Sequence, residues 1–213
     1  MSSSPNGIAL LEAFRVIRRN DHFVLSGGEH SDTYIDHYAL EQDPAVASLF
    51  CDSFARRIYA TRERKNLIPP IETVIAPAPA AVVLAHQTAH HLEGLLTRTV
   101  LSTFAEKSSE GFFIRPWNQR IIARKSVLVM DDVVTTSTTL RSVMRAVGEA
   151  GGNVVAVGAI CNRGKNEFFG VPFISFVDLQ LETYPAHSCP LCADRVPVNA
   201  EFGRGAEFLA RTH

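Results

Sequence analysis

The sequence lacks the features of a disulfide-rich, nucleic-acid-binding or membrane-bound protein. Four cysteines in 213 residues are too few for a scaffold held by disulfides, so we expect reduced thiols. Lysine plus arginine (21) and aspartate plus glutamate (22) nearly balance, which leaves no general electrostatic field to hold nucleic acid or an anionic membrane. Any anion-binding site must therefore be local.

Long apolar runs are also absent. No segment approaches the length of a membrane span, and residues 1–6 have neither the basic nor the apolar region of a secretory signal. We therefore expect a cytoplasmic protein with no membrane or nucleic-acid partner. Apolar residues still make up 46% of the chain, which is enough to bury the core of one α/β domain.

Two groups of metal-binding residue types have simpler interpretations. Cys189 and Cys192 form a CPLC segment, but one CxxC is only half of a four-ligand zinc site, and the favoured interpretation is a tight turn. His187 is a possible third ligand, and the sequence identifies no fourth. Three histidines between residues 80 and 92 fit an exposed helical face better than a metal cluster: His86, His90 and His91.

The order of the predicted elements indicates a doubly wound α/β fold, because helices and strands alternate along the middle of the chain. Helices are expected over residues 8–18, 43–62, 80–92 and 138–150, and strands over 23–25, 73–76, 95–104, 126–130 and 154–160. Residues 108–117 look irregular and mobile. The two ends break the alternation, so we expect a core over about 43–165 and a small lobe from about 1–42 and 166–213.

The strongest local pattern is VLVMDDVVTTSTTL, from Val127 to Leu140. An apolar strand runs into two adjacent carboxylates, Asp131 and Asp132, and then into a run of hydroxyl residues that opens a helix. Amides and hydroxyls at a helix N-terminus bind phosphate, and the helix dipole favours its charge. The two carboxylates can hold ribose hydroxyls or organise a hydrated Mg²⁺. The pattern therefore predicts a ribose-phosphate site, although the Asp-Asp pair alone is equally typical of a helix cap.

This pattern resembles the binding motif for 5-phosphoribosyl-1-pyrophosphate (PRPP) of type I phosphoribosyltransferases. The sequence contains neither GxxxxGK[ST] nor GxGxxG, so other phosphate-loop families lose support. The resemblance implies a type I phosphoribosyltransferase fold, a doubly wound, mostly parallel sheet flanked by helices with a small hood lobe. It implies Mg²⁺ as cofactor and a homodimer. The implied PRPP-binding residues are Asp131, Asp132, Val133, Thr135, Thr136, Ser137, Thr138, Thr139, Ala78, Ala80, Ala81, Lys107 and Arg115.

Three further segments resemble orotate phosphoribosyltransferases, the form with a CPLC segment near its end. They are FVLSGGEHSDTYID from Phe23, FAEK from Phe104 and CNRG from Cys161. The resemblance implies orotate as the base and a mobile catalytic loop around Lys107 that closes over pyrophosphate. Catalysis is assigned to Lys107, Asp131 and Asp132, metal binding through water to the same two aspartates, and base binding to Ser26, His30, Ser31, Tyr34, Thr135 and Arg163.

The sequence departs from the family pattern at three places. Ser137 stands where a glycine is common, and Ala78 to Ala81 (APAA) replace glycine or lysine in the loop that approaches the diphosphate. Ser26 and Glu29 stand where basic residues are common. These departures keep two alternatives open: transfer to another purine or pyrimidine base, and a PRPP-binding regulatory protein without catalysis.

Overall fold

The computed structural model describes residues 5–65, 68–164 and 169–212, which divide into two compact units. The first unit covers Glu41–Asp178, and the second combines Ser4–Leu40 with Leu179–His213. The sequence placed the boundaries near residues 42 and 165. The later second boundary follows from a strand at residues 173–178 that belongs to the sheet of the first unit.

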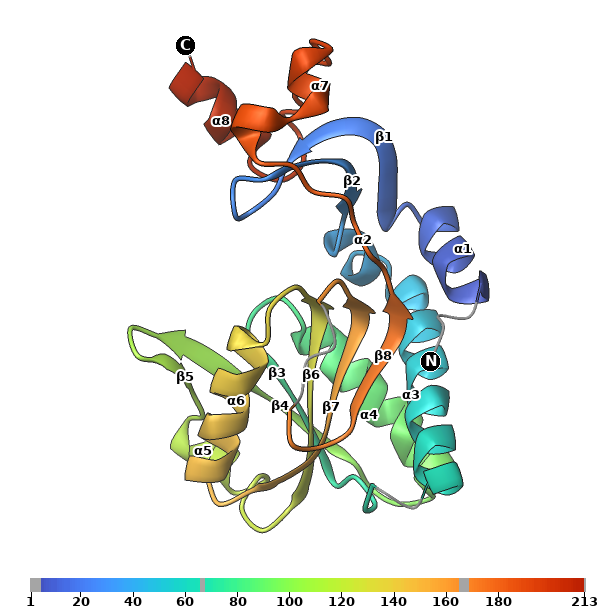
Figure 1. The fold of residues 1–213 in the computed structure, drawn as a ribbon. Coiled ribbons are helices and arrows are strands. Elements are labelled where there is room, and N and C mark those ends of the chain that lie inside the picture. Colours follow the sequence, from blue (N-terminus) through green and yellow to red (C-terminus); the bar gives the residue numbers. More distant parts are fainter. Residues whose placement is uncertain (1–4, 66–67, 165–168, 213) are drawn as a thin grey trace. The chain divides into compact units, whose positions relative to one another are not determined.

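The first unit contains a six-stranded sheet with the order β5-β4-β3-β6-β7-β8 (Figure 1). Five strands are parallel and β5 pairs antiparallel to β4 at one edge. Parallel strands share one carboxyl edge, where open α/β sheets bind ligands. The strands are β3 (Thr73–Pro77), β4 (Leu101–Ser108), β5 (Gly111–Phe113), β6 (Ser126–Val134), β7 (Asn153–Asn162) and β8 (Phe173–Asp178).

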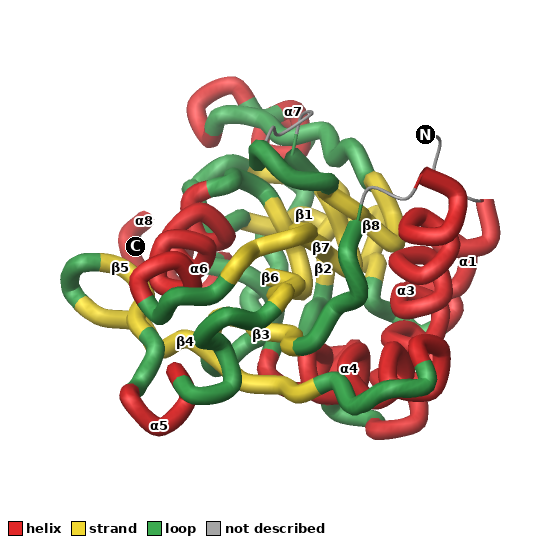
Figure 2. The backbone as a smooth tube through the Cα atoms, turned by 90° about the horizontal axis from the view of Figure 1, so that it is seen from below, coloured by secondary structure: helices red, strands yellow, loops and turns green. Residues whose placement is uncertain are grey.

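Helices cover both faces of this sheet (Figure 2). The pair α3 (Pro44–Lys65) and α4 (Val82–Leu96) packs on one face, and α6 (Thr138–Glu149) packs on the other. The short α5 (Pro116–Gln119) follows β5. On the α6 face, apolar side chains of the helix such as Leu140 and Val143 meet Val127 and Val129 of β6 in one buried cluster. The fold is therefore doubly wound, as the alternation of helices and strands predicted.

The predicted start of α3 is confirmed by its cap. Asp43 Oδ1 accepts hydrogen bonds from the backbone N–H groups of Ala45 at 2.8 Å and Val46 at 3.4 Å, and Pro44 occupies the first turn, where its missing N–H costs nothing. Most of the predicted apolar face is buried, but Leu49 is 41% exposed.

Several predicted elements differ from the structure. The first helix, α1 (Pro5–Ala13), ends earlier than residue 18, because Arg15 adopts φ 57° and the chain then enters β1 (Ile17–Val24). The strand expected over 95–104 begins at Leu101, since α4 continues to Leu96. Residues 108–117, expected to be irregular, include the β4–β5 turn, β5 and the start of α5.

The second unit is built on an antiparallel hairpin of β1 and β2 (His30–Ile35). The C-terminal segment joins this hairpin through backbone hydrogen bonds, with His30 and Tyr184 bonded both ways at 2.8 Å. Its remaining elements are α1, η1 (Ala186–Ser188), α7 (Pro190–Ala193) and α8 (Gly205–Thr212), while α2 (Tyr38–Glu41) ends at the boundary of the units. In the described ranges, no helix is long and apolar enough to cross a membrane.

Candidate functional site

The two aspartates of the strongest motif lie within β6 near its carboxyl end. The strand predicted to stop at residue 130 continues to Val134, and both side chains are only 7% exposed. Asp131 Oδ1 accepts a hydrogen bond from the N–H of Asp132 at 3.0 Å, and Asp132 Oδ1 accepts one from Val133 at 2.6 Å. Burial and the neighbouring charge of Asp132 raise the pKa of Asp131. The charged form of this buried pair is therefore destabilised, and binding of a hydroxyl group or a cation would stabilise it.

A third carboxyl group, Glu41, lies within reach of the charge of Asp132 and was missed by sequence reasoning. Burial, with a smaller contribution from the charge of Asp132, raises the pKa of Glu41 to about 7. Its Oε1 atom is buried and has no hydrogen-bond partner among the described residues. Glu41 lies 90 residues before Asp131 in the sequence, so no local pattern pointed to it.

Glu41→Gln is expected to raise the melting temperature of the ligand-free protein at pH 8 by a few degrees and to change little near pH 4. A raised acid pKa means that the folded state keeps the proton which the unfolded state releases, so wild-type stability falls as pH rises from about 4.5 to about 7. Gln removes this penalty, which is on the order of 1–2 kcal/mol after allowance for partial solvation. Thermal melts across pH 4–8 measure the difference in melting temperature between Glu41→Gln and wild type, with the exposed Glu93→Gln as control. A difference that does not vary with pH would show that it does not arise from the raised pKa of Glu41.

The segment after β6 leaves backbone donors free at the start of α6. Thr135 and Thr136 are exposed, and no hydrogen bond between described residues uses the backbone N–H of Thr135, Thr136 or Ser137. The first N–H groups of the helix itself, from Thr138 onward, also lack intrahelical partners. Together they form a row of donors suited to a phosphate.

Ser137 fits this loop without backbone strain. Its φ of −74° and ψ of −3° lie in the right-handed region, so this loop conformation needs no glycine at position 137. The Ser137 Oγ atom accepts a hydrogen bond from Arg141 Nε at 2.9 Å. The replacement of the common glycine therefore leaves the shape of the loop intact.

Arg163 directly follows the adjacent strand β7, level with the carboxyl end of β6. Its backbone N–H donates to the carbonyl of Val134 at 2.7 Å, and Asp131 pairs with Ala159 in the β6–β7 register. The turn after β7 is held by Asn162, whose Oδ1 accepts from Gly164 N–H at 3.0 Å and whose Nδ2 donates to Asp178 at 2.8 Å. The structure thus brings the predicted base-binding arginine to the edge of the sheet that carries the phosphate loop.

Two backbone N–H groups of the loop after β3 already form hydrogen bonds within the protein. Ala78 N–H donates to the carbonyl of Ala105 at 2.8 Å, and Ala81 N–H donates to that of Pro77 at 3.4 Å. Pro79, which follows a cis peptide bond, has no N–H to offer. Of the predicted diphosphate contacts Ala78, Ala80 and Ala81, only Ala80 keeps a backbone donor without a bond to a described residue.

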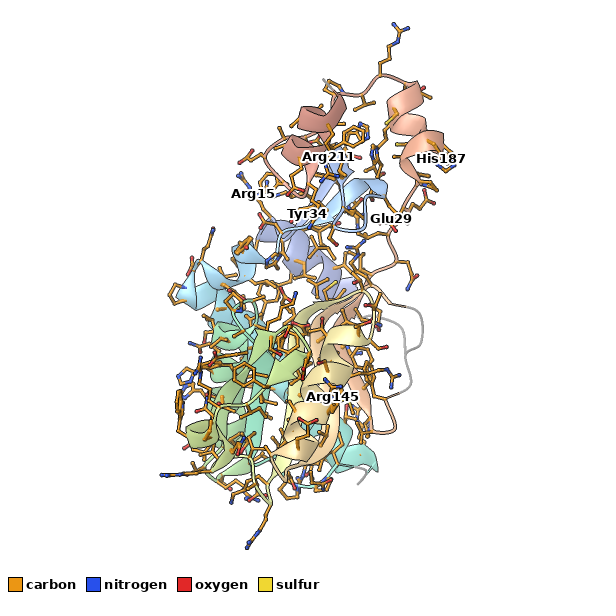
Figure 3. All side chains as sticks on the ribbon, turned by 90° about the vertical axis from the view of Figure 1, so that its left-hand side faces the viewer. Arg15, Glu29, Tyr34, Arg145, His187 and Arg211 are labelled. Carbon is orange, nitrogen blue, oxygen red and sulfur yellow. The ribbon has the colours of Figure 1, made fainter. Side chains whose placement is uncertain are left out.

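The predicted catalytic loop is the β4–β5 hairpin. Lys107 is exposed on β4, whereas Arg115 forms a two-point ion pair with Glu106, in which Nη2 lies 2.7 Å from Oε2. The hairpin tip contacts α6: Phe112 N–H donates to Ser142 Oγ at 3.0 Å, and Arg145, which projects from α6 in Figure 3, donates to the carbonyl of Glu110 at 2.9 Å. In this structure Lys107 is free to approach a ligand, and Arg115 is held by Glu106.

Four of the six predicted base-binding residues belong to the second unit. Ser26 is exposed in the turn between β1 and β2, and Tyr34 is half-buried. Ser31 is fully buried and donates to the carbonyl of Glu182 at 2.7 Å. His30 is also fully buried, with Nδ1 facing His22 and Cys192. The geometry of Ser31 and His30 favours a role in holding this unit together.

The three predicted surface histidines lie on α4. His86 and His90 are exposed and His91 is half-buried. His86 Nδ1 lies 3.0 Å from Ser102 Oγ, and His91 Nε2 lies 3.0 Å from Ser48 Oγ. Among the described residues these histidines are not grouped with other metal-ligating side chains. His86 and His90 therefore lie on the predicted exposed face, whereas His91 is half-buried against α3.

Comparison with known proteins gives the family. The phosphoribosyl transferase domain family matches residues 40–171. The chain belongs to the phosphoribosyltransferase family. It is 36% identical over 184 residues to the orotate phosphoribosyltransferase of Carboxydothermus hydrogenoformans, covering 83% of this chain and 86% of the relative. It is 34% identical over 192 residues to that of Caldanaerobacter subterraneus subsp. tengcongensis, covering 90% and 93%.

Solved structures show that this phosphoribosyltransferase has the type I fold. The orotate phosphoribosyltransferase of Francisella tularensis aligns with a TM-score of 0.60 at 15% identity, over 84% of each chain. That of Mycobacterium tuberculosis H37Rv in complex with inorganic phosphate aligns with a TM-score of 0.60 at 20% identity, over 83% of this chain and 97% of the other. The predicted fold class is therefore confirmed.

Proposed function

We propose that the chain is an orotate phosphoribosyltransferase, which transfers 5-phosphoribose from PRPP to orotate and releases pyrophosphate. The observation that carries this proposal is the shared carboxyl edge of β6 and β7, where a buried acidic pair, free amides of a helix start and an arginine lie together. The similarity to orotate phosphoribosyltransferases over most of the chain supports orotate as the base.

The acidic pair and the loop after it bind different parts of PRPP. The 5-phosphate accepts hydrogen bonds from the free N–H groups of residues 135–137 and the first turn of α6, where the helix dipole favours negative charge. Asp131 and Asp132 accept hydrogen bonds from the ribose hydroxyls. As the bond from the anomeric carbon to pyrophosphate breaks, the ribose gains positive charge, and the nearby carboxylates stabilise it.

Mg²⁺ is the metal that this donor set fits. Mg²⁺ prefers oxygen ligands, keeps several of its waters and is bound by one or two carboxylates together with substrate phosphates. Asp131 and Asp132 supply such oxygens. Glu41 Oε1 is buried without a hydrogen-bond partner among the described residues, so a proton or a nearby cation would stabilise this carboxyl group. When bound, the ion neutralises the charge that develops on the leaving pyrophosphate.

Lys107 and Arg163 supply the remaining charges. Lys107, exposed on the β4–β5 hairpin, stabilises the departing pyrophosphate, and closure of the hairpin excludes water that would otherwise hydrolyse PRPP. Arg163 holds the carboxylate of orotate through its planar guanidinium group. A ring nitrogen of orotate then forms the bond to the anomeric carbon, pyrophosphate leaves with the electrons of the broken bond, and the proton of the ring nitrogen passes to the released pyrophosphate or to water.

A base panel with PRPP and Mg²⁺ tests the proposal. Orotate loss, followed by its ultraviolet absorbance, is expected to proceed at least about 100-fold faster than conversion of neutral bases, because a neutral base cannot form charge-assisted hydrogen bonds with the Arg163 guanidinium group. A preference for a neutral base would show that the accepted base is not orotate. Calorimetric binding of PRPP without conversion of any base would favour a non-catalytic PRPP-binding protein, which the engaged amides of Ala78 and Ala81 make the second candidate.

Lys107→Ala is expected to lower kcat by about 100-fold with little change in the melting temperature. The side chain is exposed, so its loss costs little stability, but it removes a cation from the leaving group in the transition state. The exposed Arg120→Ala, beyond the hairpin at the end of α5, is the matched control. Equal kcat values for wild type and Lys107→Ala would remove Lys107 from the mechanism.

The family resemblance also supports a homodimer, and the composition supports a cytoplasmic location. Light scattering of the purified protein, with and without PRPP, measures the oligomeric state.

A further inference from the structure

A cluster of two histidines and two cysteines lies within the second unit, and it includes His30, which the sequence had assigned to base binding. One ligand atom each from His22, His30, Cys189 and Cys192 lies within 4.8 Å of all the others. The first three side chains are buried, at 1%, 0% and 3% exposure. In the described ranges this is the one place where three or more metal-ligating side chains converge in this way.

Three of the distances between these atoms match the edges of a tetrahedron around a metal ion, and a fourth is shorter. His22 Nε2 lies 2.8 Å from His30 Nδ1, 3.7 Å from Cys189 Sγ and 3.8 Å from Cys192 Sγ, and His30 Nδ1 lies 3.4 Å from Cys192 Sγ. Tetrahedral zinc with Zn–N near 2.0–2.1 Å and Zn–S near 2.3 Å requires edges of about 3.3–3.8 Å. A shift of about half an ångström in one imidazole would bring the distance between His22 Nε2 and His30 Nδ1 into this range.

The hydrogen bond on the far side of His22 fixes which nitrogen faces the cluster. His22 Nδ1 lies 2.8 Å from the carbonyl of Val196, and a carbonyl only accepts, so Nδ1 carries the proton. In the neutral ring, Nε2 then presents its lone pair to His30 Nδ1 and the two sulfur atoms. In metal-binding histidines, the ring nitrogen that does not bind the metal typically donates such a hydrogen bond to a carbonyl oxygen, which orients the ring.

The C-terminal segment needs such a link, because its own core is small. Between residues 179 and 212, the only hydrophobic side chains buried among those described are Leu179 and Cys189. The unit has roughly 70 residues in two stretches from opposite ends of the chain, a size at which disulfides or a structural metal often supplement the core. Here the two histidines come from the hairpin and the two cysteines from the C-terminal segment.

We propose that His22, His30, Cys189 and Cys192 bind one structural Zn²⁺ that ties the C-terminal segment to the β1–β2 hairpin. Two imidazole nitrogens and two thiolates in tetrahedral arrangement are typical of zinc, and four protein ligands leave no open position for catalysis. Because His22 and His30 flank the turn at residues 25–29, the ion would also hold both stems of that turn. His187, which the sequence suggested as a ligand, is exposed on η1 and lies outside the cluster (Figure 3).

The metal content of the wild-type full chain tests the proposal without any substitution. Protein purified without chelator is expected to contain about one zinc per chain by elemental mass spectrometry. After removal of zinc under reducing conditions, Co²⁺ is expected to restore one equivalent, with intense visible bands of tetrahedral geometry and a thiolate charge-transfer band in the near ultraviolet. A protein that holds no zinc and binds neither ion at micromolar concentration overturns the site, as does a mass 2 Da lower from a Cys189–Cys192 disulfide.

Substitutions then locate the ion. The double variant Cys189→Ser, Cys192→Ser is expected to lose the zinc and the cobalt thiolate band, and limited proteolysis should cleave its C-terminal segment faster. His187→Asn and His90→Asn are the controls, since both residues are exposed histidines outside the cluster, and both variants should keep one zinc. Retention of zinc by the double cysteine variant, or its loss from either control, would place the metal elsewhere.

Discussion

Asp131→Asn combined with Asp132→Asn is expected to lower kcat/KM for phosphoribosyl transfer by at least about 1000-fold. Each carboxylate supplies negative charge to a ribose that becomes positive in the transition state, and loss of one well-placed electrostatic partner typically costs 10²–10³ in rate. Asparagine keeps the shape and one oxygen acceptor but removes the charge. The loss should therefore appear in kcat as well as in KM for PRPP.

The same double variant is expected to fold at least as stably as wild type when no ligand is bound. The two aspartates are adjacent and 7% exposed, and burial and the charge of Asp132 already raise the pKa of Asp131. Replacing them with neutral amides removes this repulsion and desolvation. A loss of activity without a loss of melting temperature separates a role in the reaction from a role in folding.

The control for this prediction is Asp52→Asn on α3. Asp52 pairs with Arg56 one turn away, and such exposed helix pairs contribute little to stability. Turnover should match wild type. If the Asp131/Asp132 double variant turned over within threefold of wild type, the acidic pair would have no part in the chemistry.

Local patterns were enough to predict most of the first unit. The spacing of apolar residues and the turn residues placed α3, β3, α6 and β7 close to their observed bounds, because each has a clear apolar pattern and a boundary marked by cap or turn residues. The motif at Val127–Leu140 located the acids and the phosphate loop for the same reason: all of its parts are contiguous. Its strand ran further than expected, since β7 pairs with β6 as far as Val134.

The parts that sequence reasoning missed depend on contacts between distant segments. Glu41 precedes Asp132 by 91 residues, and only the folded chain shows that the charge of Asp132 acts on it. The missing partners of the CPLC segment were His22 and His30, which lie 162 to 170 residues before the cysteines they approach. One CxxC and two separate histidines have no spacing that a sequence pattern can detect, whereas the hairpin brings them together.

Arg163→Ala is expected to raise KM for orotate by about 100-fold or more and to change KM for PRPP by less than threefold. An arginine that pairs with a carboxylate through two hydrogen bonds contributes a charge-assisted interaction of several kcal/mol in a site shielded from water. Its backbone N–H is bonded to Val134 in the β6–β7 register, and this bond does not involve the side chain. The substitution should therefore leave the phosphate loop in place.

Arg163→Lys separates charge from geometry. Lysine restores the positive charge but not the planar fork, so KM for orotate should fall between the values for wild type and Arg163→Ala. Arg98→Ala is the control, because Arg98 pairs with Glu72 just before β3, at the amino end of the sheet. A parallel rise in KM for orotate and PRPP in Arg163→Ala would mean that Arg163 acts on the phosphoribosyl donor, and the carboxylate of orotate would then need another partner at this edge of the sheet.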